Sequence, residues 1–184
     1  MPSRARNSLD ENLKDISRLI GLHTMVGGSG PGRRHGLEVL HKSAVVLITA
    51  YWESYYEDIA AEGLAHIVKH GKSANVLPKE LKQQLAKDLK AAPHELEVWK
   101  IADRGWRTYL GSRLAELRKA RNWDFNTPKS DQIDTLFLRA LGIKQILRSW
   151  KWHGISAAKA GQKLSRYVAL RGEIAHRGQG VKVG

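Results

Sequence analysis

Arg171 and His176 stand near the end of the chain, in a segment whose apolar residues recur every three or four positions, as on one face of a helix. Arg171 occupies a position of that apolar stripe, where burying a guanidinium is costly unless a carboxylate, another chain or a phosphate meets it. Arginine binds phosphate or carboxylate, and histidine titrates near neutral pH. The two residue types together suit the binding of an anion and the transfer of a proton. The apolar residues of the stripe are Leu164, Tyr167, Val168, Ile174 and Ala175.

The spacing of this pair limits what one chain can do with it. Five residues along a helix separate two side chains by about 140° around the axis and about 7.5 Å along it, so Arg171 and His176 do not share one face. Two copies of the helix meeting across a two-fold axis would bring Arg and His groups of both chains together. The plain alternatives are a structural salt bridge for Arg171 and a histidine stabilised by the helix dipole for His176. The same spacing separates Arg148 from His153, so spacing alone is not specific.

A second candidate surface lies just before this segment. Arg148, Lys151 and Trp152 interleave basic and aromatic side chains, as surfaces that bind single-stranded RNA do. Buried tryptophans with charged neighbours are the plain alternative. His66 and His70 have the spacing of two metal ligands on one helix, but no H-E-x-x-H pattern accompanies them, and a solvated helix face is the favoured interpretation. We therefore expect no metal ion and no cofactor.

The composition favours a polyanionic partner. The 184 residues include 31 Lys and Arg against 18 Asp and Glu, a formal net charge of +13. Nucleic acid is the usual partner of so basic a chain, and an anionic membrane surface or an acidic protein is the alternative. The absence of cysteine excludes disulfides and thiol nucleophiles. No signal-peptide pattern is present, and the longest apolar run, residues 44–52, is too short to span a bilayer, so we expect a buried core helix in a cytoplasmic protein.

The elements that position these residues are all expected to be helices. A helix beginning at the Ser8–Glu11 capping box leads to a glycine-rich segment, so residues 1–35 should pack on, or lead into, a helical domain over residues 36–184. Residues 36–70 are apolar on all sides in their middle, which predicts the central helix of a bundle. No segment alternates with a period of two, so the predicted fold class is all-α. Further helices are expected over residues 81–89, 93–121, 130–141 and 156–177, with Ser130 as a cap and Gly142 and Gly178 as stops.

Three segments resemble the RiboL-PSP-HEPN branch of the HEPN superfamily, whose members are small helical bundles, usually dimeric, with an R-x(4–6)-H motif on a late helix. The segments are residues 50–56 on the central helix, residues 133–146, and residues 170–178 with Arg171 and His176. Their order and spacing along the chain make this likeness more specific than the motif alone.

HEPN proteins of this type are commonly metal-independent endoribonucleases, so the resemblance implies a homodimeric HEPN-type bundle, joined through its motif helix, that cleaves single-stranded RNA. It implies that His176 transfers protons and that Arg171 holds the scissile phosphate, because RNA supplies its own nucleophile, the 2′-hydroxyl. The products would be a cyclic phosphate and a free 5′-hydroxyl. The residues expected to bind RNA are Arg177, Arg148, Lys151 and Trp152.

Glu53 matches an acidic position of the family and lies on the apolar central segment. We expect it to pair with a largely buried Arg171, either as a catalytic residue or as part of a structural ion pair. Gly172 departs from the family pattern, because many active members have Asn, Asp or His directly after the motif arginine. The alternative function is therefore a non-catalytic HEPN module that binds RNA or a protein. A nuclease of this type would serve as a toxin or phage-defence effector, with an antitoxin as its protein partner.

Overall fold

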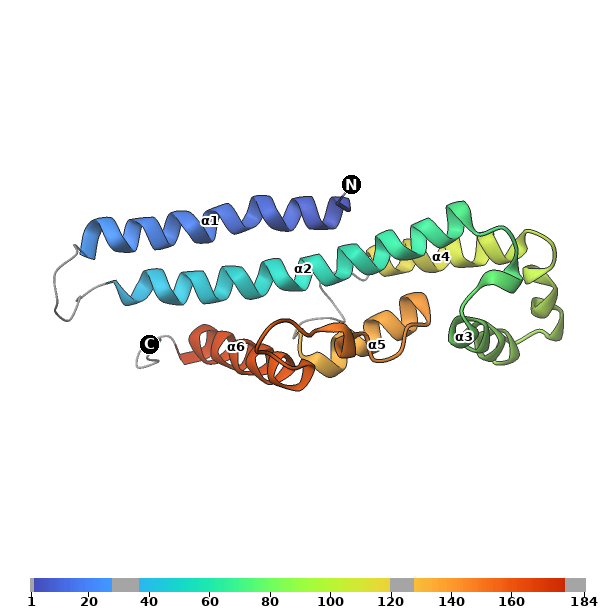
Figure 1. The fold of residues 1–184 in the computed structure, drawn as a ribbon. Coiled ribbons are helices and arrows are strands. Elements are labelled where there is room, and N and C mark those ends of the chain that lie inside the picture. The colour runs from blue at the N-terminus through green and yellow to red at the C-terminus, as the bar shows by residue number, and fades with distance from the viewer. Residues whose placement is uncertain (1, 28–36, 120–127, 178–184) are drawn as a thin grey trace.

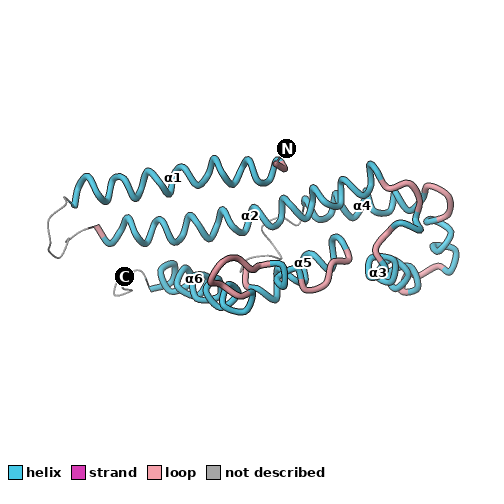
Figure 2. The backbone as a smooth tube through the Cα atoms, viewed as in Figure 1, coloured by secondary structure: helices cyan, strands magenta, loops and turns pink. Residues whose placement is uncertain are grey.

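Helix α2 (Glu38–His70) is the axis of the molecule, and α1, α4, α5 and α6 all pack against it (Figure 1). The computed structural model describes residues 2–27, 37–119 and 128–177. These residues form helices and loops without a strand, as Figure 2 shows, which confirms the predicted all-α class. No helix in the described ranges is long and apolar enough to cross a membrane. The other elements are α1 (Arg4–Gly27), α3 (Lys79–Lys90), α4 (Gly105–Lys119), α5 (Ser130–Leu141), α6 (Ala157–Arg177) and the 3₁₀ helices η1 (Ala74–Val76), η2 (Glu95–Ile101) and η3 (Ile146–Ser149).

Helix α1 lies antiparallel along one side of α2, while α5 and α6 lie along the opposite side (Figure 1). The start of α1 is tied to the C-terminal half of α2, where the backbone N–H of Ala5 donates to Glu62 Oε1 at 2.8 Å. Further along α1, the Tyr51 hydroxyl donates to Asp15 Oδ2 at 3.1 Å. Helix α4 packs on the C-terminal part of α2, and α3 packs against α5 and η2 at the same end. The bundle is therefore thickest around the C-terminal part of its central helix.

The deepest core lies at that thick end. Leu64, Leu81, Leu110 and Ile133, one each from α2, α3, α4 and α5, are 0% exposed. Burial of a side chain of this kind contributes roughly 1.5–3 kcal/mol to folding. Four helices enclose this point, so the stability of the fold is concentrated here.

The apolar run at residues 44–52 of α2 is less buried than its composition predicts. Val45 and Thr49 are buried, but the rest of the run is not, and Ile48 is 38% exposed. The reason is that α1 and α6 lie alongside this part of α2, whereas the helices that close the deep core lie at its other end (Figure 1). The expectation of a buried core helix is therefore wrong for most of this stretch, which is only partly buried.

Helix α1 begins earlier than expected. The predicted start at Ser8 is wrong, because the helix begins at Arg4 and Ser8 is an exposed residue within it. Ser3 supplies the cap: its Oγ accepts the backbone N–H of Arg6 at 3.1 Å, and its carbonyl accepts that of Asn7 at 3.0 Å.

The single helix expected over residues 93–121 is also wrong. The chain forms η2, then a turn in which Asp103 has a φ of +50°, and only then α4. The turn directs Trp106 inwards, where it is 3% exposed, and leaves Trp99 outside at 73%. Arg107, which follows, donates to the carbonyl of Val68 at 2.6 Å and so satisfies the end of α2. These tertiary contacts override the continuous helical periodicity.

The two serines expected near helix starts behave differently. Helix α5 begins at Ser130, but its N-cap residue is Lys129, and no side chain caps it, so the predicted cap at Ser130 is wrong. At the start of α6, the Ser156 Oγ accepts the backbone N–H of Lys159 at 3.3 Å, and the predicted start near Ser156 is confirmed. The predicted stop at Gly178 lies outside the described residues.

Gly142 ends α5 as the sequence predicts. It adopts a left-handed φ of +70°, and its backbone N–H donates to the carbonyl of Leu138 at 2.9 Å. A Cβ at this position would lie 2.6 Å from the backbone nitrogen of Leu81 in α3. Glycine is therefore required both for the backbone conformation and for the close approach of α3.

We expect Gly142→Ala to lower the free energy of unfolding by roughly 1–3 kcal/mol, because the variant combines a left-handed alanine with a contact against backbone. Gly111→Ala is the matched control, since no atom lies within 4 Å of its Cβ position inside α4. That control should leave stability unchanged or raise it by up to about 1 kcal/mol. Urea unfolding of both variants measures the difference, and equal stabilities would contradict this account of Gly142.

Candidate active site

Arg171 lies on the last helix, α6, at the edge of the face that packs on α2. Val168 is 3% exposed, Leu164 and Ile174 are half-buried, and Tyr167 is 51% exposed, so the apolar stripe is narrower than expected. Arg171 is half-buried rather than largely buried. The physical reason is that α2 covers a single line along α6, which leaves residues beside that line partly open to solvent.

The carboxylate of Glu53, on α2, interacts electrostatically with Arg171. The Glu53 side chain is half-buried, and this burial raises its pKa above the ordinary glutamate value. The positive charge of Arg171 acts in the opposite direction and lowers the pKa of Glu53. The fold thus brings together, from α2 and α6, the two residues that were expected to pair.

Glu57 is a further acidic residue at this site that sequence reasoning missed. It lies one turn after Glu53 on α2 and is only 7% exposed. Its negative charge contributes to the raised pKa of Glu53. The signal was present in the sequence as two glutamates four residues apart in the middle of the central helix, because that spacing places both on one face.

His176 stands in the last turn of α6 and is exposed. Because it shares a straight helix with Arg171, the two side chains diverge by about 140° around the helix axis. One chain alone therefore presents the arginine towards α2 and the histidine towards solvent.

The basic and aromatic residues before α6 are divided between core and surface. Trp150 packs edge-on against Trp52, with ring centroids 5.9 Å apart. Trp150 therefore fits the alternative interpretation, in which a tryptophan packs against the protein and does not bind RNA. Arg148, Lys151 and Trp152 are exposed, with Trp152 at 58%. Arg177, at the end of α6, is exposed as well, so the four residues expected to bind RNA all face solvent.

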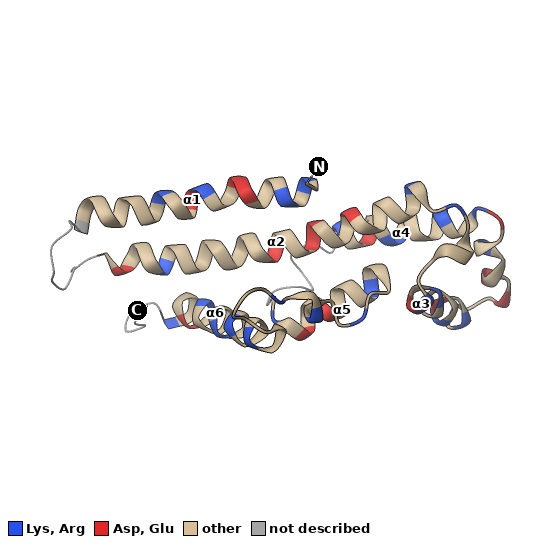
Figure 3. Cartoon of the chain, in the orientation of Figure 1, with Lys and Arg blue, Asp and Glu red and all other residues tan. Residues whose placement is uncertain are grey.

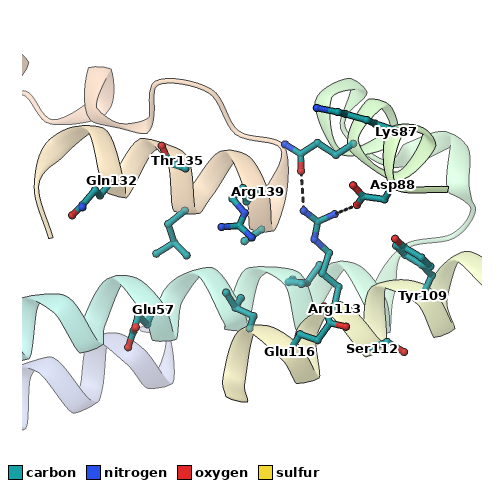
Figure 4. A pocket seen from close by; sticks show the side chains of 15 residues that line it. Glu57, Lys87, Asp88, Tyr109, Ser112, Arg113, Glu116, Gln132, Thr135 and Arg139 are labelled. Carbon is teal, nitrogen blue, oxygen red and sulfur yellow. Dashed lines mark hydrogen bonds and ion pairs between the residues drawn. The ribbon is translucent and has the colours of Figure 1, made fainter. Parts of the chain in front are cut away.

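A cavity of about 700 Å³ lies between α2, α3, α4 and α5 (Figure 4). Arg113 reaches across it and donates to Gln84 Oε1 at 3.0 Å, beside Asp88 Oδ2 at 3.4 Å. Its charged lining is balanced, so it has no electrostatic preference for a polyanion. These lining residues are Lys87, Arg113 and Arg139 against Glu57, Asp88 and Glu116.

Histidines and carboxylates of the described ranges do not gather in groups of three or more that would hold a metal ion. The His66 and His70 rings lie tilted against one another by 35°, with centroids 4.6 Å apart. The groups available for chemistry are the Arg171 guanidinium, which interacts electrostatically with the Glu53 carboxylate, and the exposed His176 imidazole five residues further along α6.

The Glu53–Arg171 interaction makes stability depend on pH in a predictable direction. A carboxyl with a raised folded-state pKa contributes stability below its unfolded pKa and loses it as the pH rises through the folded value. Arg171→Met removes the charge that lowers the Glu53 pKa. The free energy of unfolding of this variant should therefore fall more steeply than that of the parent chain as the pH rises above the ordinary glutamate value of 4.5.

At neutral pH the loss should lie between the ~1 kcal/mol of an exposed ion pair and the ~3 kcal/mol of a buried one. Urea unfolding between pH 4 and 7.5 measures it. Adding Glu53→Gln to Arg171→Met should remove the extra pH dependence. Parallel curves for Arg171→Met and the parent chain would show that the two charges do not interact.

Comparison with protein families matches residues 7–183 to the RiboL-PSP-HEPN family model. Comparisons with curated proteins and with solved structures give no match. HEPN domains are helical bundles that are generally associated with ribonuclease activity, and the helical architecture described above agrees with the first of these properties. Because the match covers nearly the whole chain, the protein belongs to the RiboL-PSP-HEPN family.

Proposed function

We propose that this protein is a metal-independent endoribonuclease that cleaves single-stranded RNA, with Arg171, His176 and Glu53 as its active-site residues. The observation that carries the proposal is the placement of Arg171. In a family associated with ribonucleases, its guanidinium lies at a half-open position, interacts electrostatically with Glu53 and remains accessible to a phosphate from solvent.

The proposed reaction uses the nucleophile that RNA carries. His176 removes the proton of the 2′-hydroxyl, and the 2′-oxygen forms a bond to the adjacent phosphorus. The bond from phosphorus to the 5′-oxygen breaks, and the leaving oxygen takes a proton, which yields a 2′,3′-cyclic phosphate and a 5′-hydroxyl. Arg171 stabilises the charge that builds on the phosphate oxygens, and Glu53 positions Arg171. The biological role that fits this activity is that of a toxin or phage-defence effector, with an antitoxin as protein partner.

We further propose that the site is completed by a second copy of the chain. Arg171 and His176 of one helix diverge, so a phosphate held by one arginine needs a histidine from another copy. Apolar side chains that such a copy would cover gather where α1 ends, α2 begins and α6 ends, at the same end of the bundle (Figure 1). They are Ile20 (60% exposed), Met25 (79%), Val26 (68%) and Val39 (66%).

Val39→Glu should therefore shift the chain from dimer to monomer, because it places a charge in the proposed apolar interface. Val76→Glu is the matched control, since Val76 is 60% exposed at the opposite end of α2. Light scattering at micromolar concentration should give a dimer for the parent chain and for the control. A parent chain that scatters only as a 20.6 kDa monomer would refute the composite site.

The decisive test of catalysis is cleavage of single-stranded RNA in EDTA. We expect the parent chain to cleave and His176→Ala to lose on the order of 100- to 10,000-fold in rate, because a positioned histidine contributes that much through proton transfer. Thermal stability should hardly change, since His176 is exposed. His153→Ala is the matched control: it removes another exposed histidine with the same spacing from an arginine, Arg148.

DNA of the same sequence should bind but stay intact, because it lacks the 2′-hydroxyl. Binding of both polymers with cleavage of neither would favour the alternative, a non-catalytic HEPN module. The observation that supports this alternative is Gly172, which stands directly after the motif arginine, where many active members have Asn, Asp or His. Cleavage that survives in His176→Ala would place the site elsewhere.

A further inference from the structure

Cationic side chains form a line along the solvent face of α6. At 100° per residue, Lys159, Lys163, Arg166 and Arg177 all point within about 40° of one direction, on the side of the helix away from Val168. The line is about 27 Å long, and the side chain of His176, in the last turn of α6, projects about 100° around the helix axis from it. Lys159, Lys163 and Arg166 are all exposed. None of these residues was among those expected from the sequence to bind RNA, except Arg177.

The positive charge on this face is not neutralised by the protein. Residues 142–177 contain eight Lys and Arg and one acidic residue, Glu173, so this stretch carries +7 of the formal charge of +13. Of these cations, Lys144 lies before α6 and pairs with Glu80 of α3 at 3.0 Å. Lys159, Lys163 and Arg166 form no ion pair with the described residues, whereas three of the four cations of α1 are paired along their own helix. Figure 3 shows the contrast, with both signs on α1 and mostly Lys and Arg on α6. The paired cations of α1 are Arg6 with Asp10 at 2.9 Å, Lys14 with Glu11 at 2.6 Å, and Arg18 with Asp15 at 2.9 Å.

Exposed aromatic rings accompany this line. Tyr167 is 51% exposed one turn after Lys163, and Trp152 is 58% exposed shortly before the helix begins. Cations that follow a backbone, interleaved with accessible rings on which bases stack, are the combination that binds single-stranded nucleic acid. A duplex would offer the phosphates but not the faces of its bases.

We propose that the solvent face of α6 is the track on which single-stranded RNA lies, contacting Lys159, Lys163 and Arg166 on its way to His176. The proposal rests on the function proposed above and adds the course of the substrate across the protein. Glu173 stands on the same face between Arg166 and Arg177, and is the one point of the track that repels a phosphate.

The test replaces Lys159, Lys163 and Arg166 together by Gln and measures binding of a fluorescent single-stranded RNA whose 2′-hydroxyls are methylated. This probe cannot be cleaved, so the result is independent of catalysis. We expect the dissociation constant to rise on the order of tenfold or more, and the slope of its logarithm against the logarithm of salt concentration to fall by about 2, because each phosphate contact on a single strand contributes about 0.7.

The matched control replaces Arg6, Lys14 and Arg18 of α1 by Gln, which removes the same formal charge from exposed positions. It should leave the affinity and the salt slope nearly unchanged. Glu173→Gln should act in the opposite direction and tighten binding. Circular dichroism should show that all three variants keep their helices, since every substituted side chain is exposed.

Equal weakening by the α6 and α1 substitutions would overturn the track, because net charge alone would then explain binding. Equally tight binding of a duplex of the same length would contradict the proposal that the α6 face prefers single-stranded RNA. If the parent chain cleaves RNA, the α6 substitutions should raise KM and leave kcat at saturating RNA within about twofold, as expected for residues that bind but do not react. Loss of kcat with KM unchanged would instead refute a binding role. Failure of the nuclease proposal itself would appear as absence of cleavage with the binding difference intact.

Discussion

The length of α2 is the constraint on which the rest of the structure depends. Its 33 residues make a rod about 50 Å long, and every helix that packs on it is shorter. Different partners must therefore cover its two halves. Around the C-terminal half, α3, α4 and α5 enclose a fully buried core, while α1 and α6 alone flank the N-terminal half and leave Ile48 and Val39 exposed. Stability is concentrated at one end, and the end at which α6 finishes keeps an open apolar surface.

The charges of the molecule are distributed just as unevenly. Helix α1 neutralises three of its four cations through pairs three or four residues apart, and the cavity beside α4 balances three cations against three carboxylates. On α6, by contrast, Lys159, Lys163 and Arg166 form no ion pair with the described residues. Part of the net positive charge is therefore displayed on the solvent face of α6, where it acts on a polyanion at long range and is screened by salt.

Arg171 is affected both by the packing along α2 and by the uneven distribution of charge. It sits where α6 meets α2, so Glu53 and the nearby Glu57 set its electrostatic surroundings, yet it is open enough to meet a phosphate. Its neighbour Gly172 has no atom within 4 Å of its Cβ position, so packing does not demand a glycine there. In this RiboL-PSP-HEPN protein the absence of a polar side chain after the motif arginine is thus a property of the sequence and not a requirement of the fold.

Much of the fold was predictable from local sequence, because helical periodicity and glycine stops act over a few residues. The central helix, the start of α6 and the stop at Gly142 were all correct, and the electrostatic interaction of Glu53 with Arg171 was expected from the family resemblance. The turn at Asp103, the cap at Ser3 and the exposure of Trp99 were not predictable, since burial of Trp106 and the reach of Arg107 to the end of α2 decide that region. The degree of burial of Arg171, the division of Trp150 from Trp152 and the unpaired line on α6 also depended on the tertiary structure. Periodicity tells which residues share a face of a helix, but only the packed neighbours determine whether that face meets protein or water.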